Sequence, residues 1–323
     1  MDLITQGILG AAVGQVGFQK TLGRKALAYG AVIGMLPDAD VFARLSTDIC
    51  SEMLHHRGFT HSLFFAPLFA PIMGWLCNYL YKQEHLPSWI GLWFWSLITH
   101  PLLDVFTVYG TQLLAPFSDH RFSFCAVPII DPAYSIPLLI SIIIGWFIKK
   151  RIGISQAISA VMLLLTSAYL FLGVAVRDNA LTYVKQHEKI PALRTEAFTT
   201  MFSIFYRRVV IEETNQFRVG FLNMLNPKPI KWHTFEKSPV SDSTLTKREI
   251  QIFYWFADEW VLPNDQDDGL LFSDMRFGTG DENLKGYWGM KIDKNEKITW
   301  ERFPVKITFS RIQDLWNTIF LFH

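Results

Sequence analysis

The stretch Ile152–Val176, IGISQAISAVMLLLTSAYLFLGVAV, decides how this chain is interpreted. It contains no acidic, basic or histidine side chain. A helix needs about 20 mostly apolar residues to cross the hydrocarbon core of a bilayer. The stretch therefore predicts a transmembrane helix, and the rest of the chain is read outward from it.

Five further segments resemble this stretch more weakly. Three also lack Asp, Glu, Lys, Arg and His, namely Ser62–Tyr81, Leu86–Thr99 and Pro132–Ile148. Two are rich in Gly and Ala, namely Leu3–Gln19 and Ala26–Pro37, and small residues let membrane helices pack closely. A buried soluble hairpin is the alternative for this pair, and a cleaved signal peptide is disfavoured because no basic residue precedes the first run. The expected fold is an α-helical polytopic membrane domain of about six spans over residues 1–176.

Composition separates the two halves of the chain. Overall, 50% of the residues are hydrophobic and 18% are charged, which excludes a disordered protein. Residues 1–176 carry 19 charged side chains and residues 177–323 carry 40. The second half is therefore expected to be a smaller α+β extramembrane domain. A net charge of +1 gives no reason to expect nucleic acid as a partner.

Local patterns in the second half predict two hairpins and a helix. The expected elements are paired strands over 205–213 and 217–221, a helix over 246–261, and a second hairpin from 286–291 and 298–303. Asp274 and Arg276 are interpreted as an internal salt bridge.

Basic residues suggest an orientation. Lys149, Lys150 and Arg151 form the tightest basic cluster beside an apolar run, and cytoplasmic loops of membrane proteins are enriched in such residues. Alternation of six spans then places the other basic loops inside as well, at Lys20, Arg24, Lys25 and Lys82. Both termini and residues 177–323 are therefore expected outside the cytoplasm.

Three groups of ionisable residues lie at the ends of the apolar runs, where such groups are costly and mark functional sites. They are Asp38 with Asp40, His56 with Arg57 and His61, and His100 with Asp104. The predicted topology places all three at the same, outer, side of the membrane.

The spacing of these groups suits a metal ion. His100 and Asp104 are four residues apart and share one helix face. Imidazole and carboxylate are ligands of zinc, manganese and iron. The candidate ligands are Asp38, Asp40, His56, His61, His100 and Asp104. Each group alone also fits a turn, a surface residue or a buried histidine, and the three cysteines show no metal-type spacing.

Two residues are candidates for catalysis. Arg57 stands beside His56 and is interpreted either as a clamp for an anionic substrate group or as an arginine at the lipid headgroups. Asp40 is the candidate general base. No Ser–His–Asp order and no Gly-rich phosphate loop is present, so a metal-activated water is the most economical nucleophile.

Several motifs together resemble a known family. They are MDLITQGILGAA at 1–12, LPDAD at 36–40, HRGFTHS at 56–62, HPLLD at 100–104, TVYGTQLLAPFS at 107–118 and IDP at 130–132, with FYRRVV at 205–210 and SDMRFG at 273–278. The chain is similar in these motifs to the membrane-bound metal-dependent hydrolase family (YdjM-like). The chain departs from it at Gln6, where some members carry His. The resemblance implies a bacterial inner-membrane protein with a histidine–aspartate metal centre, and a remote link to zinc-dependent phospholipase-type enzymes.

The leading hypothesis is a metal-dependent hydrolase at the outer membrane interface, acting on a lipid-like or phosphoester substrate. The second is a non-catalytic membrane module with a structural metal and a partner-binding tail. A transporter is disfavoured because the ionisable groups sit at one end of the helices and not at the midplane.

Overall fold

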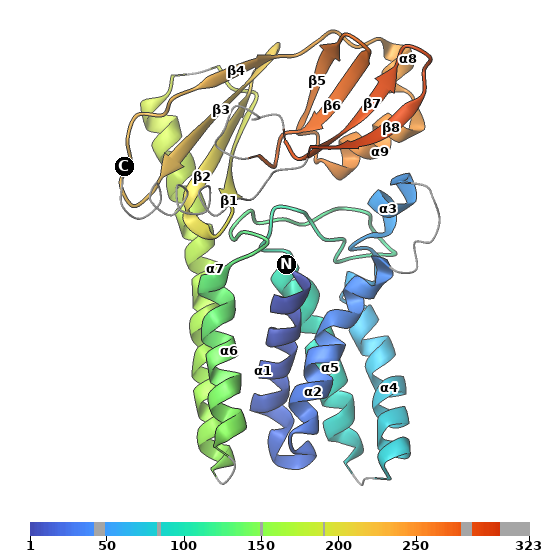
Figure 1. The fold of residues 1–323 in the computed structure, drawn as a ribbon, viewed down its shortest axis with the longest axis vertical. Helices are drawn as coiled ribbons and strands as arrows, with labels where there is room; N and C mark the ends of the chain where they lie inside the picture. Colours follow the sequence, from blue (N-terminus) through green and yellow to red (C-terminus); the bar gives the residue numbers. More distant parts are fainter. Residues whose placement is uncertain (42–48, 83–84, 149–150, 190, 279–285, 304–323) are drawn as a thin grey trace. The chain divides into compact units, whose positions relative to one another are not determined.

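The computed structural model describes residues 1–41, 49–82, 85–148, 151–189, 191–278 and 286–303. The described residues form two compact units that divide after residue 174, inside the long helix α7 (Ile152–His187). The sequence predicted a boundary after residue 176. The first unit is helical and the second is built on two β-sheets (Figure 1). The short helix α3 (Ile49–His55) groups mainly with the second unit.

The helical unit contains the first part of α7 and seven shorter helices: α1 (Leu3–Leu22), α2 (Lys25–Met35), η1 (Leu36–Val41), η2 (Phe59–His61), α4 (Phe65–Tyr81), α5 (Leu86–Asp104) and α6 (Pro132–Phe147). Helix α1 packs against α2, α5 and α6, and α4 packs against α5. Asp2 caps α1 because its carboxylate accepts the backbone N–H of Thr5 at 3.0 Å. Helix α6 begins similarly: Pro132 is its first residue, and the side chain of Asp131 accepts the backbone N–H of Ala133.

Helices α1 and α2 approach until their backbones touch. A Cβ added to Gly10 would lie 2.1 Å from the carbonyl oxygen of Gly30, which no side chain tolerates. A Cβ on Gly34 would lie 2.6 Å from the carbonyl oxygen of Gln6. This close packing holds the end of α2, and the η1 turn that follows it, beside the first turns of α1.

The expectation of a six-span helical domain is wrong. Among the described residues, only α7 is long and apolar enough to cross a membrane, with a second span if the bent pair Ile49–His61 and Phe65–Tyr81 counts as one. Helix α2 has 11 residues, far short of the ~20 that a span needs. Counting only charged residues overlooked the polar glutamines of α1 and the shortness of α4 and α6, which have 17 and 16 residues.

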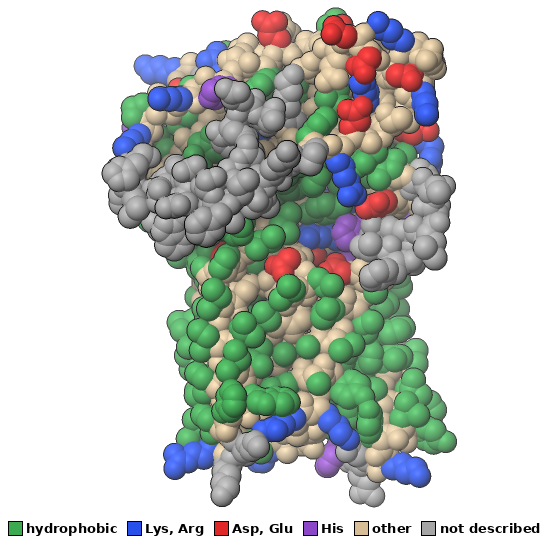
Figure 2. Space-filling view, in the orientation of Figure 1, with side chains coloured by type: hydrophobic (Ala, Val, Ile, Leu, Met, Phe, Trp, Pro, Cys, Tyr) green, Lys and Arg blue, Asp and Glu red, His purple; other side chains and the backbone are tan. Residues whose placement is uncertain are grey.

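Apolar side chains nevertheless cover the outside of the helical unit (Figure 2). Among the large exposed ones are Leu68 and Ile72 on α4, Phe147 on α6 and Leu164 on α7. Exposed apolar surface on this scale marks contact with a membrane or with another apolar partner. The helical unit is therefore suited to apolar surroundings.

The second unit contains two four-stranded antiparallel sheets, each with its strands in chain order. The strands are β1 (Arg194–Thr200), β2 (Ser203–Glu212), β3 (Gln216–Asn223) and β4 (His233–Glu236), then β5 (Val261–Gln266), β6 (Gly269–Asp274), β7 (Trp288–Asp293) and β8 (Ile298–Arg302). Two helices, α8 (Asp242–Leu245) and α9 (Arg248–Phe256), lie between the sheets in sequence. The end of α7 packs its Ala180 and Val184 on the core of the first sheet.

Both predicted hairpins are present, as β2–β3 and β7–β8. The helix expected over 246–261 is shorter, because α9 ends at Phe256 and the chain continues as strand β5 from Val261. The predicted salt bridge is confirmed: Nη2 of Arg276 lies 2.8 Å from Oδ2 of Asp274, and both side chains are buried.

Candidate metal centre

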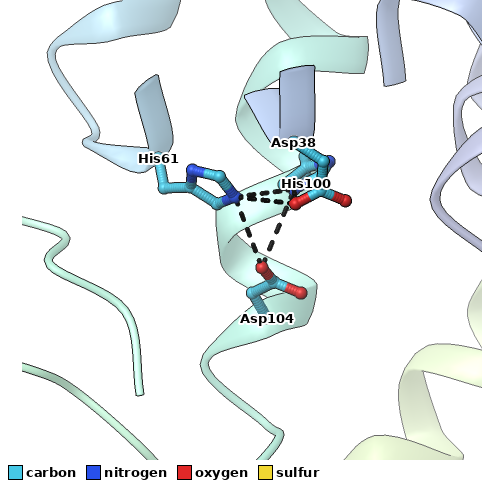
Figure 3. A group of neighbouring side chains, drawn as sticks. All are labelled: Asp38, His61, His100 and Asp104. Carbon is cyan, nitrogen blue, oxygen red and sulfur yellow. Dashed lines mark hydrogen bonds and ion pairs between the residues drawn. The ribbon is translucent and has the colours of Figure 1, made fainter. Parts of the chain in front are cut away.

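Four side chains of the helical unit converge on one point (Figure 3). Asp38 comes from the η1 turn, His61 from the η2 turn, and His100 and Asp104 from the last turns of α5. One ligand atom from each lies within 4.8 Å of all the others. His61, His100 and Asp104 have fully buried side chains, whereas that of Asp38 is 16% exposed. This group could hold a metal ion.

The separations of the ligand atoms fit a tetrahedral site. Nε2 of His61 lies 3.0 Å from Nε2 of His100 and 3.3 Å from Oδ1 of Asp38. Oδ2 of Asp104 lies 3.6 Å from Nε2 of His61 and 3.7 Å from Nε2 of His100. Ligand atoms at zinc bond lengths of about 2.0–2.1 Å and tetrahedral angles would be separated by roughly 3.3–3.4 Å. The observed distances lie on both sides of this value.

The orientation of His100 is fixed by a hydrogen bond to the backbone. Its Nδ1 lies 2.6 Å from the carbonyl oxygen of Gly34. A carbonyl only accepts, so Nδ1 donates, and in the neutral ring Nε2 presents a lone pair to the group. Such a contact from the other ring nitrogen is the usual support of a metal-ligating histidine. Since Nε2 of His61 faces the same point, a shared proton or a cation must lie between the two nitrogens.

Asp104 is held from two sides. Its Oδ1 accepts the side-chain N–H of Gln6 at 3.0 Å and also contacts the backbone nitrogen of Met1. Its Oδ2 lies 3.1 Å from Nε of Arg57 but accepts no hydrogen bond from the residues that the structure describes. The charge of Arg57 compensates this buried oxygen in part, and a buried acceptor that makes no hydrogen bond still has a lone pair for a further cation. Oδ2 is the atom that faces the two histidines.

The electrostatics keep both carboxylates ionised. Burial alone would raise the pKa of Asp38, but its interactions with the imidazoles of His100 and His61 outweigh burial and hold the pKa well below its usual range. Burial would also raise the pKa of Asp104, but the charge of Arg57, together with smaller contributions that include those of His100 and His61, outweighs it and lowers the pKa. Metal ligands must be deprotonated, and these two are in that form at neutral pH.

Two of the six predicted ligands, Asp40 and His56, lie beside this group and not in it. Nδ1 of His56 is 3.1 Å from Oδ1 of Asp40. The other oxygen of Asp40 accepts the backbone N–H of Arg57 and the hydroxyl of Thr60, both at 3.3 Å. It also lies 3.8 Å from Nδ1 of His61, the nitrogen that faces away from the group. Asp40 therefore contacts His61 on the side that faces away from the group, and His56 is bonded to Asp40.

Arg57 contacts the group through Asp104. Besides that ion pair, its Nη1 donates to the hydroxyl of Thr107 at 2.9 Å, and its guanidinium lies over the ring of Tyr109, 4.7 Å from the centroid. Arg57 is nearly fully buried and has a positive φ of 58°, a conformation that non-glycine residues rarely adopt.

Sequence reasoning did not single out the residues that support the group. Gln6 was noted only as a departure from the family pattern, and the carbonyl of Gly34 gives no sequence signal. Thr107 and Tyr109 lie in a quoted motif but carried no assigned role. Arg121, whose guanidinium lies over the same Tyr109 ring and donates to the carbonyl oxygen of Gly110 at 3.0 Å, could not be linked to the site without the fold.

Comparisons with known proteins show which family the chain resembles. The family model described as YdjM inner membrane protein matches residues 1–179, more than half of the chain. The inner membrane protein YbcI of Escherichia coli (strain K12) is 33% identical over 125 residues, which are 37% of this chain and 70% of YbcI. The uncharacterized protein YfhP of Bacillus subtilis (strain 168) is 29% identical over 165 residues, 48% of this chain. The chain spans about half (49%) of the length of YfhP.

No solved structure matches the chain significantly. The matched residues include all four members of the candidate metal centre and the whole apolar part of α7. By this match, the chain belongs to the YdjM inner membrane protein family.

Proposed function

We propose that the protein is a metal-dependent hydrolase of the bacterial inner membrane, acting on a lipid-like or phosphoester substrate at the outer membrane interface. The observation that carries the proposal is the convergence of Asp38, His61, His100 and Asp104 at tetrahedral separations, with only Asp38 reaching solvent. A buried site with one accessible edge admits a substrate group from that edge alone.

The donor set favours zinc, with manganese or iron as alternatives, because two imidazoles and two carboxylates suit all three. The four residues of the group would hold the ion. A divalent metal supplies Lewis acidity at such a site and lowers the pKa of a water molecule. Asp38 and Asp104 contribute two negative charges, which match those of a divalent ion.

Asp40 was predicted as the general base, but its oxygen lies near Nδ1 of His61, the nitrogen that faces away from the ligand group. We therefore propose that Asp40, bonded to His56, orients His61 and does not take a proton from the site directly. Arg57 was predicted to clamp an anionic substrate group. Its contacts with Asp104 and Thr107 favour a different role: the charge of Arg57 keeps Asp104 ionised and oriented.

The orientation also belongs to this proposal. Basic residues lie at or beside the helix ends away from the candidate centre, and basic residues there favour the cytoplasm; they are Lys20, Arg24, Lys25 and Lys82. Lys149 and Lys150 lie outside the described residues. A reporter that is active only in the cytoplasm, fused after residue 189, should give no signal if the second unit is extracytoplasmic. A signal there would move the site and its substrate to the cytoplasmic side.

A second candidate function is a non-catalytic membrane module with a structural metal. The observation that favours it is the number of donors, because four protein ligands complete a tetrahedral zinc shell and catalytic zinc sites keep one position open. In that case the metal braces the η1 and η2 turns against α5, and the sheet unit binds partners.

The deciding experiment uses the full chain, purified in detergent and loaded in turn with zinc, manganese and iron(II). Each form is assayed with a chromogenic phosphodiester and with phospholipid in mixed micelles. The hydrolase proposal expects turnover that is lost in Asp104→Asn and kept in Asp274→Asn. If every loaded form is inactive and removal of the metal lowers the melting temperature, the structural role replaces the catalytic one.

A further inference from the structure

The helical unit contains a second site that the metal centre does not use. It is an apolar cavity of about 790 Å³ between α1, α5, α6 and α7. Its floor includes Leu9 and Leu103, which are almost fully buried, and its rim includes Trp95, Leu102 and Phe171, which are exposed. The volume lies in the range of small-molecule sites, about 300–1,000 Å³.

The residues that line the cavity offer few hydrogen-bonding groups to a polar ligand. Of the nineteen residues around the cavity, only Thr99, Ser167 and Tyr134 carry hydroxyl groups and none is charged. The hydroxyl of Thr99 already donates to the carbonyl oxygen of Trp95 at 2.7 Å. An occupant must therefore be held by apolar contact along its length.

The cavity is long and follows the helices. Its α1 wall runs from Leu9 to Phe18, about 13–14 Å at 1.5 Å per residue, and its α5 wall runs from Trp95 to Leu103, about 12 Å. Its third wall includes Leu163, Leu170 and Phe171 on α7, the helix that is long and apolar enough to cross a membrane. The open rim therefore includes part of a helix that is long and apolar enough to cross a bilayer.

Helix α5 separates the cavity from the candidate metal centre. Trp95, Thr99 and Leu102 follow each other at helical spacing and line the cavity, whereas His100 and Asp104 lie on another face of the same helix. Gln6 on α1 donates to Asp104, and Leu9, one turn further along α1, lines the cavity. The upper end of the cavity is therefore within about one helical turn of the centre.

We propose that this cavity binds one acyl chain of a membrane lipid. The absence of charge in the lining, the elongated shape and the wall provided by α7 select a hydrocarbon chain over a polar ligand. The proposal goes beyond hydrolysis, since the chain would bind whether or not the metal centre turns over a substrate.

The structure offers a matched pair of variants for the test. A Cβ added to Gly17, which lines the cavity, meets nothing within 4 Å, so Gly17→Leu occupies the cavity without displacing backbone. A Cβ added to Gly153 also meets nothing within 4 Å, and Gly153 does not line the cavity. Gly153→Leu is therefore the control for a new leucine on an open helix surface.

The experiment uses the full chain in detergent and a phosphatidylglycerol with a diazirine in one acyl chain. Photolabelled peptides are quantified by mass spectrometry as the probe concentration rises. We expect saturable labelling in the peptides that carry 102–106 and 163–171. Gly17→Leu should lower it at least about five-fold, Gly153→Leu should leave it unchanged, and Asp104→Asn should keep it, which separates this result from any failure of hydrolysis.

The exposed face of α4 provides the internal reference, because Leu68 and Ile72 touch lipid or detergent without a cavity. Labelling at 102–106 that rises without saturation, as labelling of α4 should, would overturn the proposal. So would equal labelling of Gly17→Leu and wild type. A benzophenone amino acid at position 102 that cross-links to a second copy of the chain, in place of lipid, would assign the cavity to an interface and also overturn it.

Discussion

One fully buried carboxylate in each unit, Asp104 in the helical unit and Asp274 in the sheet unit, shows how differently such a group can be satisfied. In the sheet unit, Asp274 accepts the backbone N–H, Nε and Nη2 of Arg276 and the indole N–H of Trp288. In the helical unit, the oxygen of Asp104 that faces His61 and His100 accepts no hydrogen bond from the described residues. A saturated carboxylate stabilises a fold, whereas an unsaturated one keeps a lone pair available for a ligand.

The largest expected effect comes from Asp104→Asn. The amide keeps the size of the side chain but loses the charge and the anionic oxygen that faces the two histidines. We expect metal affinity to fall by at least about 100-fold, beyond the 10–100-fold typical of changes around the ligands. Metal per protein, measured by inductively coupled plasma mass spectrometry, should drop to background. Asp274→Asn is the matched control, and equal loss of metal in both variants would contradict the comparison.

The reverse experiment removes the saturated carboxylate. Asp274→Ala leaves the guanidinium of Arg276 buried without its partner, and such a change costs about 3–5 kcal/mol of unfolding free energy. Denaturant unfolding followed by tryptophan fluorescence measures this loss. The protein that remains folded should bind metal as the wild type does. Unchanged stability together with a loss of metal would show that Asp274 serves the centre.

A third buried carboxylate, Asp131 in the helical unit, should make the stability of the protein depend on pH. Burial raises the pKa of Asp131 to about 6, while its hydrogen bonds from Tyr169 and Ala133 oppose the shift. The folded state then holds a proton that the unfolded state releases between about pH 4 and pH 6, so stability falls as the pH rises through this window. The shift corresponds to at most about 3 kcal/mol, from 1.36 kcal/mol for each unit of pKa.

Asp131→Asn keeps the helix cap and cannot titrate. The difference in melting temperature between variant and wild type should therefore grow in favour of the variant from pH 4 to pH 6. Parallel melting curves over this range would show that Asp131 titrates normally.

The smallest expected effect concerns Gln6. Gln6→Leu removes the donor to Asp104 and to the carbonyl oxygen of His100, and we expect metal affinity to fall about 10-fold, or about 1.4 kcal/mol. Gln15→Leu is the control, because Gln15 is also buried on α1 but donates to Ser155. Competition with a zinc-binding dye gives both affinities. Equal losses would assign the effect to helix packing and not to Asp104.

The sequence predicted the helix-borne part of the centre better than its turns. His100 and Asp104 are four apart on one helix, and this periodicity alone brings them together. Asp38 or Asp40, and His56 or His61, could not be told apart because each pair lies in or beside an irregular turn whose path depends on tertiary packing. The η1 and η2 turns direct Asp38 and His61 inward and leave Asp40 and His56 bonded to each other.

The fold was predicted unevenly for a related reason. Hairpins such as β2–β3 follow from local alternation and a polar turn, so they could be read directly. Membrane spans were overcounted because segments without charged residues were treated as hydrophobic. Helix α1 has no acidic residue and yet contains Gln15 and Gln19, whose amides form hydrogen bonds with Ser155 inside the bundle. The run Ala26–Pro37 predicted the extent of α2 to within two residues, but a helix of this length is too short to cross a membrane.

The most direct test of the account is X-ray absorption spectroscopy at the zinc edge of the purified full chain. The account predicts one zinc per chain with four nitrogen or oxygen neighbours at about 2.0–2.1 Å, imidazole scattering from two histidines, and loss of the whole signal in Asp104→Asn. Sulfur neighbours at about 2.3 Å, or the same spectrum from the Asp104→Asn variant, would place the metal elsewhere and contradict the proposed centre.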